Sequence, residues 1–277
     1  MTDDVPPAWK LPTGVNASLW RYAHTERLAV EEDDYFADHP LFDRDATEVD
    51  ARFVEPGRIV DLGCGSGRHA IRFAIRGFSS VAVELSEAML REVGRKAVDW
   101  DVSVGRVKAN LCRLTCFPDA TFDYGLSMFS TLGMIRGPKA RRIALGEAAR
   151  ILRPGGRLAL HVHNIWLNRK DAEGRAWLRE QAIATLMGSE SAGDRRMRYR
   201  GLHGMEVHLY RWGEIKREIR RAGLRIDETI PIDEVTAAPI PRPWFFHDIR
   251  AGGWLIFCRR GETRPFSRRE KVPRSGG

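Results

Sequence analysis

The sequence predicts an α/β protein built around a mostly parallel β-sheet, on the strength of three observations. From residue 58 onward, short runs rich in Val, Ile and Leu alternate with longer amphipathic runs, as strands joined by crossover helices do. One strand-like run leads directly into a turn with three glycines, at residues 59–68 (IVDLGCGSGR). No stretch approaches about 18 consecutive apolar residues, so no membrane-spanning helix is expected.

The expected strands follow from the apolar runs, and the expected helices from apolar residues at helical spacing between start and stop signals. Gly77 and Gly223 end helices, Ser86 is positioned as an N-cap, and Pro138 occupies a first helical turn. Strands are expected at Arg58–Leu62, Ser80–Glu84, Val102–Ala109, Phe122–Phe129, Arg157–Val162, Leu224–Ile230 and Trp254–Arg259. Helices are expected at Asn16–Glu31, Ser66–Arg76, Ser86–Val98, Pro138–Leu152, Asp171–Met187 and Trp212–Ala222.

Three segments fall outside this alternation and define the domain organisation. Residues 1–50 form an N-terminal extension with a proline-rich leader, one helix and an acidic loop, and residues 51–260 form the main domain. An insertion at about residues 166–210 contains one helix, a loop rich in glycine and arginine, and an extended run. Residues 261–277 form a basic tail that is expected to be disordered.

Charge is distributed unevenly along the chain. The formal net charge is +8, yet residues 1–50 contain twelve acidic and four basic residues, so the basic excess lies in the remainder. Basic residues cluster at 195–200 (RRMRYR), at 216–221 and in the tail. Such clusters occur in nucleic-acid-binding proteins and also on solvated arginine-rich surfaces, and both interpretations stay open.

The cysteines and the first residues of the chain bear on metal binding and location. Cys64, Cys112, Cys116 and Cys258 lack the paired spacing of a zinc site, so no metal is expected and the thiols are interpreted as reduced. The first residues have neither the basic start nor the apolar stretch of a secretory signal. A cytoplasmic protein without membrane association is therefore expected.

The glycine turn at residues 63–67 is the strongest functional signal in the chain. Glycine is used where the backbone turns sharply or approaches a ligand closely, because a Cβ atom would collide there. The helix that follows presents unpaired N–H groups at its N-terminus, which suits a polar ligand. The G-x-G-x-G spacing lacks the extra residue of the G-x-G-x-x-G pattern in dinucleotide-binding dehydrogenases. A different ligand is therefore expected.

Four segments, in order, resemble the class I S-adenosylmethionine-dependent methyltransferases. They are the glycine turn, VAVE at 81–84, ANL at 109–111 with FPDATFD at 117–123, and ARILRPGGRL at 149–158. Many relatives carry aspartate in place of Asn110. The resemblance covers residues 55–165 well and 205–260 loosely. It implies a Rossmann-like, doubly wound sheet of seven strands with an antiparallel last strand, an N-terminal helical cap and an insertion after strand five.

The resemblance also implies S-adenosyl-L-methionine as the cofactor and assigns roles to residues. Asp61 would support the glycine turn and reach the methionine amino group, and Glu84 would accept hydrogen bonds from the ribose hydroxyls. Leu85 and Asn110 would flank the adenine, and Met128 would lie beside the methionine moiety. Core packing is the alternative for Leu85 and Met128. The expected cofactor-binding residues are Asp61, Gly63, Cys64, Gly65, Gly67, Glu84, Leu85, Asn110, Leu111 and Met128.

Methyl transfer needs little acid–base chemistry, because the donor is already activated and the enzyme gains chiefly from proximity and alignment. A base is required only when the acceptor must lose a proton. His163, at the end of the fifth expected strand, is the candidate catalytic residue, because ligands bind at strand carboxyl ends in such sheets. His161, His203 and His208 are weaker candidates, and a structural role is the alternative for each.

Three functions remain open from the sequence. The first is methylation of an oxygen or nitrogen of a small-molecule acceptor, with the extension and the insertion forming the acceptor pocket. The second is methylation of RNA, such as tRNA, through the basic clusters. The third is a cofactor-binding scaffold that no longer catalyses.

Overall fold

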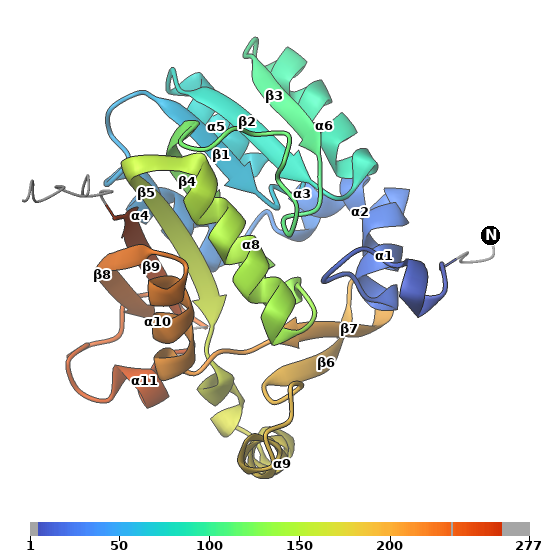
Figure 1. Cartoon of the computed structure of the whole chain (residues 1–277), viewed down its shortest axis with the longest axis vertical. Helices are drawn as coiled ribbons and strands as arrows, with labels where there is room; N and C mark the ends of the chain where they lie inside the picture. The colour runs from blue at the N-terminus through green and yellow to red at the C-terminus, as the bar shows by residue number, and fades with distance from the viewer. Residues whose placement is uncertain (1–4, 234, 262–277) are drawn as a thin grey trace, which may run out of the picture.

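The computed structural model describes residues 5–233 and 235–261. Within these residues the main sheet has seven strands in the order β3-β2-β1-β4-β5-β9-β8 (Figure 1). β9 runs antiparallel to β5 and β8, and the other neighbours are parallel. The expected Rossmann-like sheet with an antiparallel last strand is confirmed. The strands are β1 (Arg58–Leu62), β2 (Ser79–Glu84), β3 (Val104–Lys108), β4 (Phe122–Ser127), β5 (Leu152–His163), β8 (Leu224–Ile232) and β9 (Gly253–Arg260).

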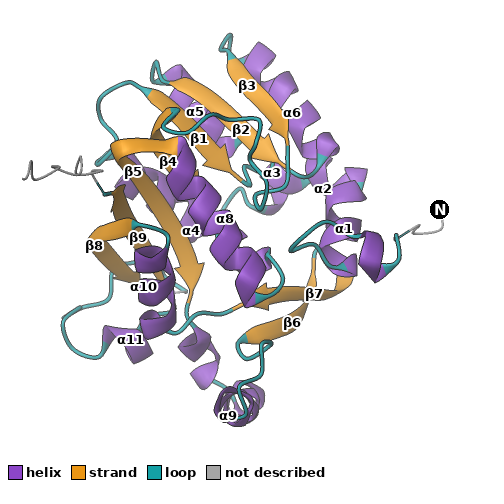
Figure 2. Ribbon diagram, viewed as in Figure 1, coloured by secondary structure: helices purple, strands orange, loops and turns teal. Residues whose placement is uncertain are grey.

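Helices cover both faces of this sheet (Figure 2). The face with α8 and α10 buries alanine and isoleucine side chains of these helices against β4, β5 and β9. The opposite face buries Phe53 and Phe73 among α4, α5 and the central strands. Each such large apolar side chain stabilises the fold by about 1.5–3 kcal/mol. The helices are α4 (Pro40–Asp50), α5 (Arg68–Ile75), α6 (Glu87–Asp99), α8 (Pro138–Ile151) and α10 (Trp212–Arg221).

Several element boundaries agree with the local signals in the sequence. β1 covers the residues expected for it, and the Ser86 side chain caps α6 by accepting the Met89 N–H. Pro138 lies in the first turn of α8. Two further short helices flank the strand ends, namely α7 (Thr131–Met134) and α11 (His247–Arg250).

The single helix expected at Asn16–Glu31 is wrong, because the helix is interrupted at Thr25. This residue has an extended backbone, and its hydroxyl donates to the carbonyl of Arg21, which competes with helix continuation. The acidic segment at 31–34, expected as a loop, instead enters a further helical turn. The extension contains η1 (Ala8–Lys10), α1 (Ala17–His24), α2 (Glu26–Val30) and α3 (Glu32–Tyr35), followed by α4.

The insertion contains a β-hairpin where a loop rich in glycine and arginine, followed by an extended run, is expected, and the second hairpin strand includes part of that run. Arg200 and Gly201 connect the two hairpin strands with φ angles of 49° and 82°, the paired positive φ of a type I′ turn. Asparagine, aspartate or glycine usually occupies the first of these positions, so an arginine conceals the turn. The elements are η2 (Ile165–Arg169), α9 (Ala172–Leu186), β6 (Asp194–Tyr199) and β7 (Leu202–His208).

β5 begins at Leu152, earlier than the expected start at Arg157. Leu152 pairs with Phe122 of β4, and the register then shifts before the remaining pairs form. Gly155, with φ of 76°, lies within this irregular stretch, as expected where a strand accommodates extra residues. The turn expected at 153–156 is therefore part of the strand.

Two expectations concern the tail and the membrane. The basic tail expected at 261–277 lies, from residue 262 onward, outside the described residues. Every helix in the described part of the chain is too short or too polar to span a lipid bilayer.

Candidate functional site

The glycines that follow β1 turn the chain at the carboxyl edge of the sheet. Gly63, Gly65 and Gly67 have φ angles of 76°, 54° and 84°, which favour glycine. The amides of Gly63 and Cys64 both donate to the carbonyl of Val83 in β2, over 2.8 and 3.2 Å. The turn is therefore fixed against β2 and exposes backbone rather than side chains.

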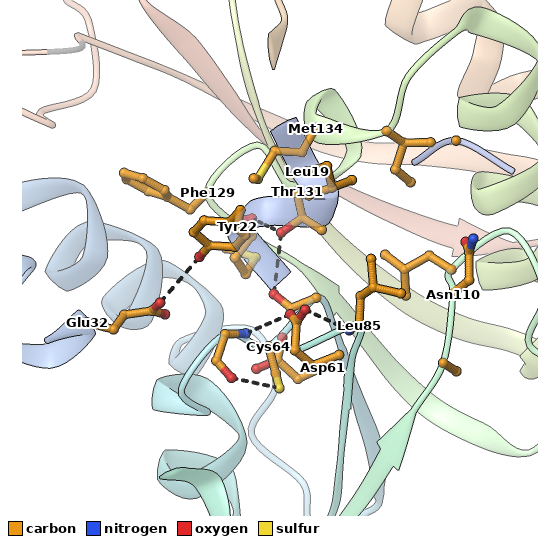
Figure 3. A pocket seen from close by; sticks show the side chains of 18 of the residues that line it. Leu19, Tyr22, Glu32, Asp61, Cys64, Leu85, Asn110, Phe129, Thr131 and Met134 are labelled. Atoms are coloured by element: carbon orange, nitrogen blue, oxygen red, sulfur yellow. Dashed lines mark hydrogen bonds between the residues drawn. The ribbon is translucent and has the colours of Figure 1, made fainter. Parts of the chain in front are cut away.

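A pocket lies against this turn and contains about 1060 Å³ of space, part of it open to solvent. Nine of the ten residues expected to bind the cofactor line it, several of which are visible in Figure 3. Gly67 is the exception, because it faces the neighbouring helix: a Cβ atom there would lie 2.6 Å from Val93 of α6. Its small size allows α5 and α6 to pack closely. The nine are Asp61, Gly63, Cys64, Gly65, Glu84, Leu85, Asn110, Leu111 and Met128.

Glu84, at the end of β2, links that strand to the glycine turn. Its carboxylate accepts the N–H groups of Gly65, Leu85 and Ser86 at 3.2, 2.7 and 3.1 Å. Burial raises the pKa of Glu84, and the three amides act in the opposite direction. A carboxylate offers about four acceptor positions, so at least one stays available for a ligand hydroxyl.

Asp61 is a buried carboxylate of β1 that lines the same pocket. Its Oδ2 atom has no hydrogen-bond partner among the described residues. Burial, with a smaller contribution from the negative charge of Glu84, raises the pKa of Asp61 to about 7. An unpartnered buried carboxylate is unfavourable, so this position suits a ligand that brings a hydrogen-bond donor.

Asn110 and Phe129 lie toward opposite ends of the cavity in Figure 3. The Asn110 Nδ2 atom donates to the Thr13 carbonyl, and its Oδ1 atom accepts the Cys112 N–H, both at 2.8 Å. The second amide hydrogen and a second lone pair stay available to a ligand. Met128 lines the pocket and also packs in a buried apolar cluster, and its contact with the methionine moiety stays a prediction.

The N-terminal extension, expected as a helical cap, forms most of a roof over the pocket. The Tyr22 hydroxyl donates to a Glu32 carboxylate oxygen over 3.4 Å (Figure 3). Arg200 of the hairpin reaches the same carboxylate at 3.3 Å and the Leu28 carbonyl at 2.7 Å. No local sequence pattern marks these residues, because tertiary packing brings them together. The roof residues are Thr13, Gly14, Val15, Leu19, Tyr22, Glu32, Phe36, Phe42 and Tyr199.

Two acidic residues of α3 hold the glycine turn from the roof side. Glu32 accepts the Ser66 N–H at 3.1 Å, and Asp33 accepts the Ser66 hydroxyl at 3.0 Å. Lys96 of α6 donates to the Ser66 carbonyl at 2.9 Å and forms an ion pair with Asp33. Burial raises the pKa of Glu32. The acidic run of the extension is thus part of the site.

The pocket has an excess of acidic groups. Glu32, Asp61 and Glu84 line it, and Arg68 is the one lysine or arginine among the described residues that do so. Arg68 itself lies 3.7 Å from Asp33, which offsets its charge. Negative charge together with aromatic walls favours a ligand that carries positive charge and a planar ring.

His163, at the end of β5, lies outside this pocket. It lines a second pocket, which shares Phe129 with the first. Burial, with smaller contributions from the charges of His161 and His39, lowers the pKa of His163 to about 3. The ring is therefore neutral at pH 7, where it is a hydrogen-bond acceptor but a weak base. Catalysis by His163 stays a prediction.

The other two histidines near strand ends are held by carboxylates. His161 Nδ1 lies 2.6 Å from Asp45 of α4, and both side chains are fully buried. His208 lies between Asp194 and Glu214, at 2.7 and 2.9 Å. Burial acts to lower the pKa of His208, but the two carboxylates raise it overall. These contacts give both rings a structural role.

The basic cluster at 195–200 is largely engaged within the protein. Arg196 pairs with Glu206 at 2.8 Å, and the Arg200 side chain is only 2% exposed. Arg195 lies over the Trp177 ring at 5.5 Å. The ion pair of Arg196 and the burial of Arg200 reduce the free positive charge that a nucleic-acid backbone requires, whereas Arg195 keeps its charge.

Comparison with known proteins identifies the central part of the chain. A family model described as a methyltransferase domain matches residues 59–156. Over this interval the chain is therefore similar to methyltransferase domains. The matched interval contains β1, the glycine turn, Glu84, Asn110 and the junction of α8 with β5.

The chain is also similar to several named methyltransferases. A ubiquinone/menaquinone biosynthesis C-methyltransferase of Geobacter sulfurreducens is 35% identical over 114 residues, which are 39% of this chain and 43% of that protein. The 27-O-demethylrifamycin SV methyltransferase of Amycolatopsis mediterranei is 37% identical over 106 residues, 37% of each chain. The chain spans about half or less of the length of the curated relatives it matches.

The likeness in fold extends beyond residues 59–156. The 1,6-didemethyltoxoflavin-N1-methyltransferase of Burkholderia thailandensis, solved with 1,6-didemethyltoxoflavin and S-adenosylhomocysteine, matches with a TM-score of 0.58 at 19% identity. The match covers 91% of this chain and 94% of that one. The two proteins therefore share a fold over most of their length.

Proposed function

We propose that this protein is an S-adenosylmethionine-dependent methyltransferase that methylates an oxygen or nitrogen of a small-molecule acceptor. The pocket carries this proposal, because a glycine turn, three acidic side chains and an aromatic roof surround one space. S-adenosylmethionine has an ammonium group, a sulfonium cation and an adenine ring, so its charge and shape are complementary. The methyltransferase domain and the S-adenosylhomocysteine of the Burkholderia enzyme support this ligand.

The residues present fit this cofactor. Asp61 would accept a hydrogen bond from the ammonium group and thereby satisfy its unpartnered Oδ2 atom. Glu84 would accept a ribose hydroxyl, and Leu85 and Asn110 would lie along the adenine. Bound S-adenosylmethionine supplies an activated methyl group: its C–S bond breaks, the electron pair stays on sulfur, and the acceptor atom gains the methyl group and releases a proton. The protein orients the two reactants and excludes water.

Calorimetric titration with S-adenosylmethionine and, separately, S-adenosylhomocysteine tests the proposal. We expect both to bind in the micromolar range. Absence of binding by both would contradict the proposed function and favour a scaffold that acts through a partner.

Replacement of Glu84 by alanine is expected to weaken binding of S-adenosylhomocysteine by about 1.5–3 kcal/mol, roughly a 10- to 150-fold increase in Kd. The loss has two sources, the missing acceptor for ribose and the loosened amide of Gly65. Calorimetry measures the effect. Glu87→Ala is the matched control, because Glu87 is exposed and pairs with Lys108 outside the pocket. Equal affinities for the two variants would show that Glu84 does not hold the cofactor.

Cofactor affinity is expected to rise by about tenfold between pH 5.5 and pH 7. Asp61, whose pKa is raised to about 7, is mostly protonated at the lower pH. A ligand ammonium group favours the ionised carboxylate, so binding lowers this pKa and releases a proton. The range lies below the usual pKa of an α-amino group, about 7.7–8.0, so the ligand keeps its charge.

Calorimetry at pH 6 in buffers with different ionisation enthalpies measures the released proton directly. In the Asp61→Asn variant we expect most of the pH dependence to disappear, although Glu32 and Glu84 contribute a remainder. Proton uptake, or an affinity in the wild-type protein that does not change with pH, would argue against contact between Asp61 and the ammonium group.

The alternative of RNA methylation has weaker support, because much of the cluster at 195–200 is engaged in internal contacts. A titration of tRNA at increasing salt separates the two proposals, since phosphate recognition weakens steeply with salt. The proposal also places the enzyme in the cytoplasm, where its four free cysteines would stay reduced.

A further inference from the structure

The second pocket lies beside the first at the carboxyl edge of the sheet, at the end of the next strand. β2, β1, β4 and β5 are neighbours in this order, and Glu84, Asp61 and Met128 at the first three lie in the proposed cofactor pocket. His163 follows at the end of β5 and opens into the second pocket, which contains about 930 Å³ of space, part of it open to solvent. Phe129 is common to both pockets, so the second pocket adjoins the first.

The wall shared by the two pockets is aromatic. The Phe129 ring stacks on Phe42 with centroids 4.5 Å apart and an interplanar angle of 17°. The rings of His39 and His163 approach Phe129 edge-on, with centroids at 5.1 and 5.8 Å. Phe129 has a φ of 47°, an uncommon backbone conformation for a bulky residue, which the surrounding packing maintains. Such a wall suits a planar ring.

The mouth of the second pocket carries positive charge. Lys170 and Arg195 line it, with Asp171 as the one acidic residue among the described lining residues. The Asp171 carboxylate is engaged, since it accepts the Gly174 N–H at 2.7 Å as the cap of α9. Arg195 lies 3.9 Å from Glu173, whose side chain is 90% exposed, so this pair is weak.

We propose that the second pocket is the acceptor pocket and that the acceptor is an aromatic compound with a carboxylate group. The ring would lie against Phe129, His39 and His163, and the carboxylate would bind Lys170 and Arg195. This inference rests on the proposed methyltransferase function, because it places the acceptor beside the cofactor pocket across Phe129. Positive charge at this pocket disfavours amines, and the aromatic wall favours a planar ring over an aliphatic chain.

Benzoate and benzylamine are the probes for this pocket, because they share a ring and differ in charge at pH 7. The protein is labelled with 13C in its histidine rings, and the His163→Gln variant assigns the His163 signal. We expect benzoate in the millimolar range to shift the His163 signal, and benzylamine to leave it unchanged. Equal shifts with the two probes, or no shift with benzoate, would overturn the proposal.

A charge-matched pair of variants tests the two cations. Lys170→Gln/Arg195→Gln is expected to raise the Kd for benzoate by about tenfold or more, because charge-assisted contacts are lost. Arg217→Gln/Arg220→Gln is the control, since it removes the same charge from exposed positions on α10, outside both pockets. Equal weakening in both variants would indicate a general charge effect and contradict the proposed contact.

Calorimetry with S-adenosylhomocysteine on the same samples separates this inference from the proposed function. Retained S-adenosylhomocysteine binding without a selective benzoate response overturns the acceptor assignment and leaves the methyltransferase proposal intact. Absence of S-adenosylhomocysteine binding in the wild-type protein overturns the methyltransferase proposal itself.

Discussion

Gly65→Val is expected to abolish detectable binding of S-adenosylmethionine. Gly65 has a φ of 54°, which a β-branched residue rarely adopts, and a Cβ atom there would collide with a carboxylate oxygen of Glu32. Its amide also donates to Glu84, so the substitution disturbs both the turn and the proposed ribose ligand. Calorimetric titration of the purified variant measures the effect.

The same substitution should lower the free energy of unfolding only moderately, by about 1–3 kcal/mol for a strained backbone conformation. Gly155→Val is the matched control, because Gly155 also has positive φ, at 76°, but has no atom within 4 Å of an added Cβ and lies outside the pocket. We expect this control to lose comparable stability and to keep its affinity for S-adenosylmethionine. If both variants bind like the wild-type protein, the glycine turn is not part of the cofactor site.

His161→Leu is expected to destabilise the protein by about 3–5 kcal/mol, the usual loss when a buried carboxylate is left without its partner. His161 and Asp45 are both fully buried and lie 2.6 Å apart, which connects β5 with α4 of the N-terminal extension. The substitution leaves the Asp45 carboxylate without its partner. Urea denaturation followed by circular dichroism measures the change.

The double variant His161→Leu/Asp45→Asn is the control for this interpretation. An amide has no charge to bury, so the double variant should recover part of the lost stability. Additive losses from the two substitutions would mean that the contact contributes little. A loss of less than about 1 kcal/mol in His161→Leu alone would show that the extension is held by other contacts, such as the apolar packing around Val49.

The sequence predicts the sheet and the glycine turn well because their signals are local. β1 is a run of apolar residues that ends in a glycine turn, and Ser86 and Pro138 mark helix starts by their own hydrogen bonding and backbone geometry. The pocket residues at the glycine turn and at the neighbouring strand ends are predicted from the same local signals. Their binding roles stay predictions that the calorimetric experiments test.

A cap over the pocket is expected from the resemblance, but the individual roof residues and the hairpin could not be predicted, because they depend on contacts between distant parts of the chain. Tyr22 meets Glu32 within the extension, but Arg200 reaches them from a position 168 residues later than Glu32. The type I′ turn at Arg200 and Gly201 is held by the hairpin register rather than by a usual turn sequence. His161 is likewise a catalytic candidate in the sequence, because its contact with Asp45, 116 residues away in the chain, is not visible there.

The roof also bears on the exchange of the proposed cofactor for its product in the pocket. It is closed by contacts between distant segments, such as Arg200 with Glu32 at 3.3 Å and Asn16 with Glu206 at 2.9 Å. In the proposed methyltransferase, exchange of S-adenosylhomocysteine for S-adenosylmethionine would therefore be coupled to the breaking of these contacts. A bound nucleoside would in turn slow hydrogen–deuterium exchange at the amides of the roof.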